Sequence, residues 1–307
     1  MQPDKNDIRQ MKSFDINDTV LGKQTGTPSQ YDASLLFRIP RSENRIKYDI
    51  QESQLPFTGY DVWNCYEFSF LTQNGLPVSR ILKIIIPTNS RYLVESKSLK
   101  LYLNSFNMER YEKTIQDSED KIKNIILKDL NNLLECNVQI SLLTPKSPET
   151  TPFQSYPVIN DMIPDKVLES IPLTEYQESP LLLKGIKTEQ MHEYIFKSDL
   201  LRSNCRVTNQ PDWGDLFVRI QTPYEIDLCS VIAYIVSFRK ENHFHEEVVE
   251  MIFKRLQEAF SPQKMMVAAM YTRRGGIDIN PIRATHTDWL EPAFTETENR
   301  LAKTWRQ

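Results

Sequence analysis

The sequence predicts an α+β fold in which an antiparallel sheet carries helices on one face, and this unit is expected twice in tandem. Two apolar runs separated by an Asn-Gly turn predict a β-hairpin. In residues 108–135, which follow the hairpin, apolar residues recur at three- and four-residue intervals, which is typical of an amphipathic helix. The same order of elements returns in the second half of the 307 residues, which indicates an internal duplication.

The elements of the first half follow from local patterns. Residues 65–71 and 79–86 are the predicted hairpin strands. They are joined at residues 73–75 (Gln-Asn-Gly), where the Asn-Gly pair supplies the positive φ angles of a tight turn. Residues 108–135 form the predicted helix. Residues 138–143, in which valine, isoleucine and leucine alternate with other side chains, form a third predicted strand.

The second half repeats the residue types of the first. Residues 218–223 resemble residues 82–87, a helix is predicted over 243–260 and a strand over 265–271. Five pairs of positions align at one constant offset: Ser98, Tyr102, Leu103, Ser105 and Phe106 with Ser230, Tyr234, Ile235, Ser237 and Phe238. Because tandem units of this kind leave free sheet edges, we expect association into a larger closed assembly.

A proline-rich segment divides the chain. Residues 145–180 hold seven of the 18 prolines. Proline removes a backbone donor and blocks a central strand, so this segment is predicted as a connector draped over a surface. The predicted organisation is a first module over residues 1–144, the connector over 145–180 and a second module over 181–307.

Composition narrows the class of function. The net charge of −4 makes direct binding of nucleic acid unexpected, and no apolar run is long enough to predict a membrane partner. The 4 cysteines are widely spaced and the N-terminus is polar, which predicts a reducing, cytoplasmic compartment. The 8 glycines frame neither G-x-G-x-x-G nor a P-loop, which excludes the commonest glycine-rich nucleotide-binding loops.

Cys205 is the candidate nucleophile. Arg202 and Arg206 flank it, and nearby positive charge increases the thiolate fraction of a cysteine. The alternative is a small buried hydrophobic residue, which is the common role of a free cysteine. Asp212 lies in a Pro-Asp-Trp-Gly segment, predicted as a turn. Such a turn either aims the carboxyl group as an acid or base or contains an ordinary aspartate that caps its own backbone.

Three further segments carry polar side chains that suit a ligand. Residues 243–247 (His-Phe-His-Glu-Glu) stand at a predicted helix start, and two histidines are too few for a metal site, so no metal is expected. Residues 95–102 are predicted as a solvated loop or edge strand, in which Lys97 suits a phosphate and Glu95 suits a base edge. Residues 273–276 (Arg-Arg-Gly-Gly) are predicted as a phosphate-binding turn or a plain turn.

Five motifs in order resemble one enzyme family. The motifs are Glu-Ser-Lys-Ser-Leu-Lys-Leu-Tyr at 95–102, Ser-Asn-Cys at 203–205, Pro-Asp-Trp-Gly at 211–214, Phe-His-Glu at 244–246 and Tyr-Thr-Arg-Arg-Gly-Gly at 271–276. They are similar to those of the nitrile reductases of queuosine biosynthesis, the NADPH-dependent 7-cyano-7-deazaguanine reductases, in their long, two-module form. The resemblance covers about residues 60–290.

The resemblance implies two tandem tunnelling-fold (T-fold) modules, a homodimer, and reduction of the substrate nitrile to a primary amine with two NADPH. It implies that Cys205 attacks the nitrile carbon to give a covalent thioimide and that Asp212 supplies the proton to the nitrile nitrogen. The implied substrate-binding residues are Val94, Glu95, Ser96, His245 and Glu246. The implied cofactor-binding residues are Ser96, Lys97, Arg274 and Gly275, so NADPH is expected at these residues instead of a glycine-rich loop.

Other functions use some of the same residues. A Cys-His-Asp hydrolase or amidotransferase acting on a purine-like substrate would use Cys205, His245 and Asp212 but leave residues 95–102 without a role. A zinc cyclohydrolase of the related fold needs more clustered ligands than the sequence holds. The basic setting of Cys205 argues only weakly against a non-catalytic module that binds a purine or pterin.

Overall fold

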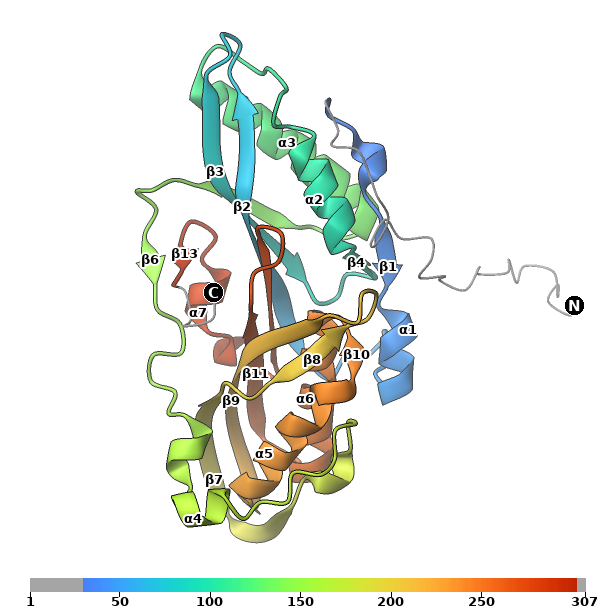
Figure 1. The fold of residues 1–307 in the computed structure, drawn as a ribbon, viewed down its shortest axis with the longest axis vertical. Coiled ribbons are helices and arrows are strands. Elements are labelled where there is room, and N and C mark those ends of the chain that lie inside the picture. The colour runs from blue at the N-terminus through green and yellow to red at the C-terminus, as the bar shows by residue number, and fades with distance from the viewer. Residues whose placement is uncertain (1–29, 303–307) are drawn as a thin grey trace, which may run out of the picture.

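A nine-stranded sheet runs through the computed structural model, which describes residues 30–302 (Figure 1). The strand order is β10-β8-β9-β11-β12-β2-β3-β5, with β7 paired to β9. Within the described residues all pairs of this sheet are antiparallel except β10–β8. The bounds are β2 Thr58–Leu71, β3 Pro77–Pro87, β5 Gln139–Leu143, β7 Gly185–Ser198, β8 Arg202–Cys205, β9 Pro211–Ile226, β10 Asn242–His243, β11 Lys264–Tyr271 and β12 Ile277–Ala284.

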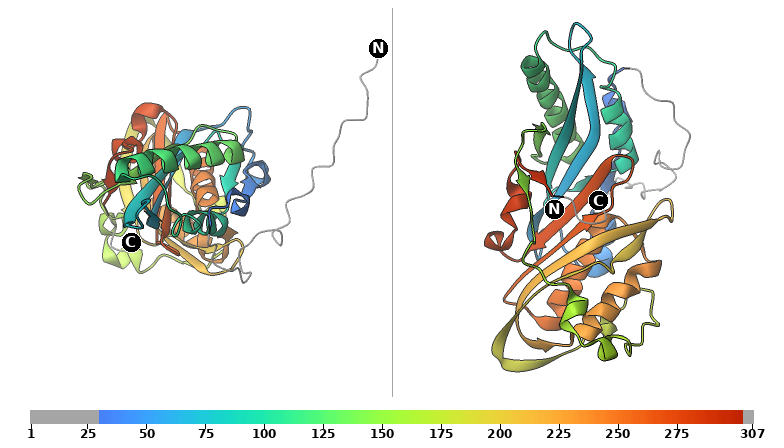
Figure 2. Two further views of the ribbon diagram at one scale, coloured as in Figure 1. Left: turned by 90° about the horizontal axis from the view of Figure 1, so that it is seen from above. Right: turned by 60° about the vertical axis from the view of Figure 1, so that its left-hand side comes forward.

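Four helices cover one face of this sheet (Figures 1 and 2). Helices α2 (Ser96–Asn104) and α3 (Ile115–Leu134) pack on the first-half strands, and α5 (Leu228–Ser237) and α6 (His245–Phe260) pack on the second-half strands. The predicted mixed fold with an antiparallel sheet is confirmed. The shorter elements are β1 Arg38–Pro40, α1 Ser42–Arg45, β4 Tyr92–Val94, β6 Glu149–Thr150, α4 Asp165–Leu168, α7 Pro292–Thr295 and β13 Arg300–Leu301.

Strands β12 and β2 join the two halves of the chain into one sheet. Their antiparallel register runs from Ile277 opposite Cys65 to Ala284 opposite Thr58. Neither β12 nor β7 was among the strands expected from local pattern. Because this seam lies at the centre of the sheet, side chains from both halves meet on the face that carries the helices. The division into modules at 1–144 and 181–307 stays a prediction, and residues 1–29 lie outside the described residues.

The predicted hairpin is confirmed as β2–β3, but the turn differs from expectation. Gly75 has a φ of 89°, whereas Asn74 does not adopt a positive φ. The Thr72 N–H donates to Leu76 O and the Gly75 N–H to Thr72 O, which makes a wider loop than a two-residue turn. A wider loop needs only one left-handed residue, so the Asn-Gly pair supplies one positive φ instead of two.

The predicted helix over 108–135 is α3, but it begins later. The backbone N–H of Leu71 donates to Glu109 O and that of Tyr111 to Leu71 O, which holds residues 109–111 in an extended bridge. Thr114 then caps the helix by accepting from the Asp117 N–H. The helix predicted over 243–260 and the strand over 265–271 are confirmed as α6 and β11, each within two residues at its start.

The expectation of a loop or edge strand over residues 95–102 is wrong, because this segment forms helix α2. Glu95 is the N-cap, and its carboxylate accepts from the backbone N–H groups of Lys97 and Ser98. Leu99 and Tyr102 are fully buried three residues apart. The alternation of charged and larger residues suggested a period of two, but burial of one side of a helix against the sheet determines the structure.

Helices α2 and α5 make the same local contacts at the predicted offset. Ser98 Oγ donates to Glu95 O, and Ser230 Oγ donates to Asp227 O, each at 2.6 Å. Asp227 caps α5 as Glu95 caps α2. Edge-to-face ring pairs close both helices: Tyr102 with Phe106 at 5.2 Å and Tyr234 with Phe238 at 5.5 Å.

The proline-rich connector contributes to the core as well as covering a surface. Phe153 stacks on Phe217 of β9 at 4.2 Å and lies against Phe294 at 5.2 Å, on the sheet face opposite the long helices. Tyr156 is also buried there. The segment thus lies across the sheet as expected while burying aromatic rings. Among residues 30–302, none of the helices has the length and apolar character needed to cross a membrane.

Candidate functional site

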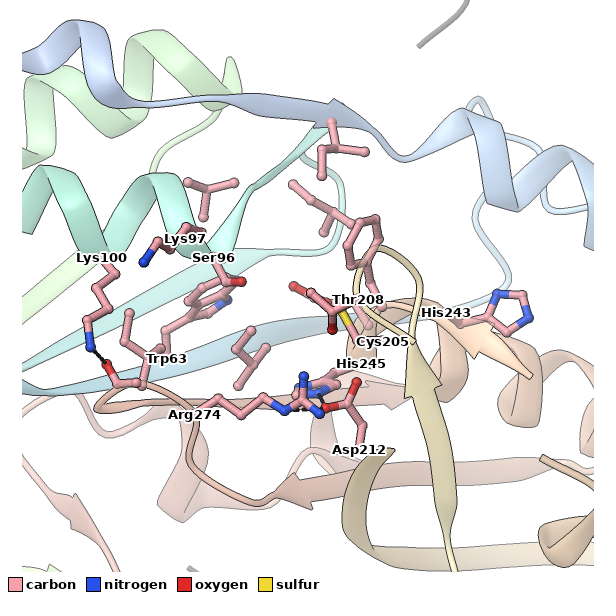
Figure 3. A pocket seen from close by; sticks show the side chains of 18 of the residues that line it. Trp63, Ser96, Lys97, Lys100, Cys205, Thr208, Asp212, His243, His245 and Arg274 are labelled. Atoms are coloured by element: carbon pink, nitrogen blue, oxygen red, sulfur yellow. Dashed lines mark hydrogen bonds and ion pairs between the residues drawn. The ribbon is translucent and has the colours of Figure 1, made fainter. Parts of the chain in front are cut away.

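A cavity of about 260 Å³ opens where the first-half helix α2 meets the second-half strands (Figure 3). This volume is near the lower end for small-molecule sites, roughly 300–1,000 Å³, and suits one heteroaromatic ring system better than a whole dinucleotide. The lining residues come from both halves: Ile39, Trp63, Leu93, Val94, Ser96, Lys97 and Lys100, and Cys205, Thr208, Gln210, Asp212, His243, Phe244, His245, Glu246, Arg274, Gly275, Ile277 and Ile279.

Cys205 ends β8 and lies in the wall of the cavity. Its backbone N–H donates to Gln210 O at 2.8 Å, which closes a short loop. Both flanking arginines bind other groups. Arg202 donates to the Arg239 carbonyl, and Arg206 pairs with the Glu247 carboxylate at 2.9 Å. The two arginine side chains that suggested an activated thiol are therefore paired with other groups.

Asp212 lies at the start of strand β9, so the predicted Pro-Asp-Trp-Gly turn is wrong. Pairing of β9 with β8 places Asp212 opposite Ser203, because the turn occurs earlier, between the two strands. Only 4% of its surface is exposed. Its Oδ1 lies 2.8 Å from Arg274 Nε and 3.3 Å from His245 Nε2. Three residues from separate predicted motifs thus meet at one carboxylate oxygen.

His245 is the first residue of α6 and is held flat against a second ring. It stacks on Tyr271 with ring centroids 3.8 Å apart and planes 3° from parallel. Its buried Nδ1 has no hydrogen-bond partner among the described residues. His243 faces elsewhere, between the carboxylates of Glu241 and Glu247. Within residues 30–302 no group of three or more His, Cys, Asp or Glu side chains that could hold a metal ion is found.

Glu246 lies in the first turn of α6 and lines the cavity with 3% of its surface exposed. Burial raises its pKa to about 8, because removing a carboxylate from water penalises the charged form. The carboxylate of Asp61 contributes to the rise, while Arg41 and Arg283 oppose it. Near neutral pH the group is therefore mainly a carboxylic acid, able to donate as well as accept.

Five buried charged side chains lie behind this carboxyl group and join both halves. Arg283 Nη2 lies 2.8 Å from Asp61 Oδ1 and 3.0 Å from Glu250 Oε1. Arg45 binds both oxygens of Glu250, at 3.0 and 2.8 Å, and Arg41 pairs with Asp61. Bidentate arginine–carboxylate pairs fix geometry as well as charge. The network therefore holds the start of α6 in place relative to β2.

The first-half residues lie at the opposite wall. Val94 ends β4, and Ser96 and Lys97 form the first turn of α2. Glu95 is 1% exposed and is not among the lining residues, because both of its oxygens face backbone N–H groups of its own helix. Burial raises its pKa, and the two backbone hydrogen bonds oppose that rise.

The turn over residues 273–276 is confirmed as the tight connection between β11 and β12. Gly275 and Gly276 adopt φ values of 54° and 78°, which side chains rarely adopt. A Cβ on Gly276 would come within 2.4 Å of Glu67 Cδ. Lys100, for which no role was expected, donates to Gly275 O at 2.8 Å and so connects α2 to this turn.

Several lining residues were not expected from the sequence. They are Ile39, Trp63, Leu93, Lys100, Thr208, Gln210, Phe244, Ile277 and Ile279. Phe244 stood inside a recognised motif, whereas Trp63 lay just outside the predicted strand over 65–71. Observed strand β2 begins at Thr58, and a longer strand assignment would have placed Trp63 on the helix-covered face.

The chain matches one family over both halves. A family model described as nitrile reductase, 7-cyano-7-deazaguanine-reductase N-term matches residues 27–142, and one described as QueF-like protein matches residues 211–289. The relative in Burkholderia vietnamiensis (strain G4 / LMG 22486), named NADPH-dependent 7-cyano-7-deazaguanine reductase, is 39% identical over 266 residues, 87% of this chain and 93% of the relative. This chain belongs to that reductase family.

Two further relatives of the reductase family carry the same name. The protein of Burkholderia lata is 40% identical over 266 residues, 87% of this chain and 93% of its own. The protein of Cupriavidus metallidurans is 39% identical over 272 residues, which are 88% of this chain and 94% of that relative. A solved structure of the archaeosine synthase QueF-Like in the apo form aligns with a TM-score of 0.28 and 14% identity, over 32% of this chain and 95% of that chain. The family is one of nitrile oxidoreductases, and its names state NADPH as cofactor.

Proposed function

We propose that this protein reduces the nitrile of 7-cyano-7-deazaguanine to the aminomethyl group of 7-aminomethyl-7-deazaguanine, consuming two NADPH in queuosine biosynthesis for tRNA modification. One observation carries the proposal within the family: Cys205 and Asp212 share a cavity with Ser96 and Lys97, which come from the other half of the chain. A thiol, a buried carboxyl group and cationic side chains at one cavity are the groups that such a reduction needs.

Cys205 acts as the nucleophile in this proposal. Its sulfur forms a bond to the nitrile carbon while one C–N π bond breaks, and the thiol proton passes through Asp212 to the nitrile nitrogen, giving a neutral covalent thioimide. Asp212 suits this transfer because it is 4% exposed and positioned by Arg274 and His245. After reduction at that carbon the C–S bond breaks, the thiolate leaves, and the imine is reduced and protonated to the amine. A thioimide accepts hydride more readily than a nitrile, which is the advantage of the covalent step.

The deazaguanine base is held by groups from both halves. His245 and Glu246, adjacent on α6, face the cavity beside the base N–H edge, with Val94 and Ser96 on the opposite wall. Glu95, which does not line the cavity, contributes by capping α2 and so holding Ser96 and Lys97 at the wall. A site built on such polar groups rejects bases that would leave them unpaired.

The cationic side chains at the cavity fit NADPH. Lys97, Lys100 and Arg274 line it, and Arg274 is 36% exposed in its side chain, so these groups can meet phosphate from the solvent side. Ser96 and Gly275 supply small or flexible positions beside them. When bound, NADPH supplies the two hydrides of the reaction. Arg274 also holds Asp212, so one side chain connects the proton-transferring residue to the cofactor-binding wall.

We further propose that the two halves are tandem T-fold modules and that the protein works as a cytoplasmic homodimer. The repeated contacts of α2 and α5 support the tandem modules. Strands β5 and β7 are edge strands of the described sheet, and such edges favour association.

Intact-mass measurement tests the proposal. Incubation with 7-cyano-7-deazaguanine in the absence of NADPH gives a single covalent adduct, and Cys205→Ala abolishes it. Cys229→Ala is the matched control, because Cys229 lies at the start of α5 away from the cavity, and it keeps the adduct. When NADPH is then added, the adduct disappears and NADPH is oxidised. If the wild-type protein forms no adduct and oxidises no NADPH, the proposed function is refuted.

One geometric feature also suits a Cys-His-Asp hydrolase on a purine-like substrate. His245 Nε2 lies 3.3 Å from Asp212, as in a base held by its orienting carboxylate. The same experiment separates the two functions, because a hydrolase consumes no NADPH.

A further inference from the structure

Trp63 places a buried, unpaired donor at the cavity. The residue lies on β2 between Ile279 of β12 and Ile84 of β3, and 1% of its surface is exposed. It nevertheless lines the cavity, and in Figure 3 its indole lies beside Ser96 with the ring nitrogen on the side facing the middle of the pocket. Its Nε1–H has no hydrogen-bond acceptor among the described residues.

A buried hydrogen-bond donor without an acceptor needs a physical explanation. Buried polar groups in folded proteins are hydrogen-bonded in the large majority of cases. Indole N–H is a donor only, so its partner must present an acceptor atom. The ring could have been replaced at this position by an apolar side chain if packing were its only role, since an unmade buried hydrogen bond is destabilising.

The surroundings of the indole restrict the partner further. Its strand partners Ile84 and Ile279 are apolar, and it shares a buried cluster with Val94 and Ile277, while Ser96 lies beside the indole. Of the cations that suit phosphate, Arg274 pairs with Asp212, and Lys97 follows Ser96 in the first turn of α2. Because the strand partners of Trp63 are apolar, an uncharged acceptor fits this position better than a phosphate oxygen, which loses more hydration on burial.

We propose that the Trp63 indole N–H donates a hydrogen bond to a carbonyl oxygen on a heteroaromatic ligand bound in the cavity. The inference rests on the proposed function, which brings two such carbonyls to the site: the ring carbonyl of the deazaguanine and the carboxamide of the nicotinamide. Trp63 is thereby a specificity-determining residue, because a ligand without the carbonyl leaves the indole N–H unpaired.

The test removes the N–H while keeping the ring. Replacing Trp63 with benzothienylalanine exchanges the N–H for sulfur at nearly the same shape, and Trp63→Phe is the genetically simple companion. One arm measures the dissociation constant of 7-cyano-7-deazaguanine in the Cys205→Ala background, without NADPH. The other measures KM for NADPH with Cys205 intact. Ile279→Val is the matched control, because it trims the same wall without changing any donor.

We expect the benzothienylalanine protein to bind its ligand about tenfold more weakly in one arm and less than twofold more weakly in the other. Its melting temperature should be unchanged. A loss in the first arm identifies the base as the acceptor, and a loss in the second identifies the nicotinamide. A change below twofold in both arms overturns the inference while the proposed function stands. Equal losses in both arms, matched by Ile279→Val, indicate packing and also overturn it. If wild-type protein forms no thioimide, the proposed function fails, and this inference fails with it.

Discussion

Replacing Glu246 by glutamine should flatten the pH dependence of stability. Glu246 is 3% exposed and has a pKa of about 8, against an ordinary value of 4.5, chiefly because of burial. Above pH 4.5 the unfolded chain releases this proton, whereas the folded protein keeps it until about pH 8. The unfolded state therefore binds fewer protons in that window, and the free energy of unfolding falls as the pH rises.

The magnitude follows from the distance between the two pKa values. Each pH unit within the window costs about 1.4 kcal/mol, so the full window corresponds to about 5 kcal/mol as an upper value. Between pH 5 and pH 9 the free energy of unfolding should fall less in Glu246→Gln than in the wild type, by up to about 4 kcal/mol. The reason is that glutamine keeps the volume of the side chain and does not titrate. The other titrating groups are common to both proteins, and Asp61, whose carboxylate helps to raise the Glu246 pKa, has a lowered pKa of its own and stays charged across this range.

Urea unfolding at pH 5, 6, 7, 8 and 9 measures this difference. Glu258→Gln is the control, because Glu258 lies on the same helix with its side chain 43% exposed, and its curve should run parallel to the wild type. Parallel curves for Glu246→Gln, within about 1 kcal/mol across the range, would refute the assignment of a buried, protonated carboxyl group at this position.

Two further predictions concern proton transfer and the C-terminal segment. Asp212→Asn should leave base binding within about threefold and lower turnover at least about 100-fold, measured by titration of the base and by NADPH oxidation; equal losses in both would show a structural role. Lys83→Met removes the ammonium group that donates to the carbonyl oxygens of Glu296 and Asn299 at 2.9 and 3.0 Å. Amide hydrogen exchange over residues 296–302 should then be at least about tenfold faster, and unchanged exchange would contradict this anchoring role.

Elements with a clear local period could be predicted, and elements without one could not. Helix α6 follows from its apolar spacing, because it buries an apolar face, and strand β11 follows from its continuous apolar run, because all of its residues after Lys264 are buried. Helix α2 was predicted as a loop or edge strand, since its nine residues are short and its charges alternate with larger side chains. Asp212 was assigned to a turn because proline and glycine flank it, yet pairing with β8 extends the strand through it. In both cases tertiary packing overrides the local preference.

The candidate site was predicted in its residues but not in its geometry. The motifs named Cys205, Asp212, His245 and Arg274, and the structure brings all four to one cavity. No sequence spacing predicts that Arg274 binds Asp212, because the two are joined through the pairing of β11 with β9. Trp63 belongs to no motif, and only the seam between β2 and β12 places it at the cavity.

The sequence by itself determined the mixed antiparallel fold, the order of the helices and strands that have clear periods, and the family, because these depend on local pattern and on motifs read in order. Only the tertiary structure decided the electrostatics of the site. Sequence neighbours suggested that Arg202 and Arg206 activate Cys205, but these side chains bind the Arg239 carbonyl and the Glu247 carboxylate. Coulomb energies depend on distance in space and on burial, neither of which is encoded in the spacing of residues along the chain.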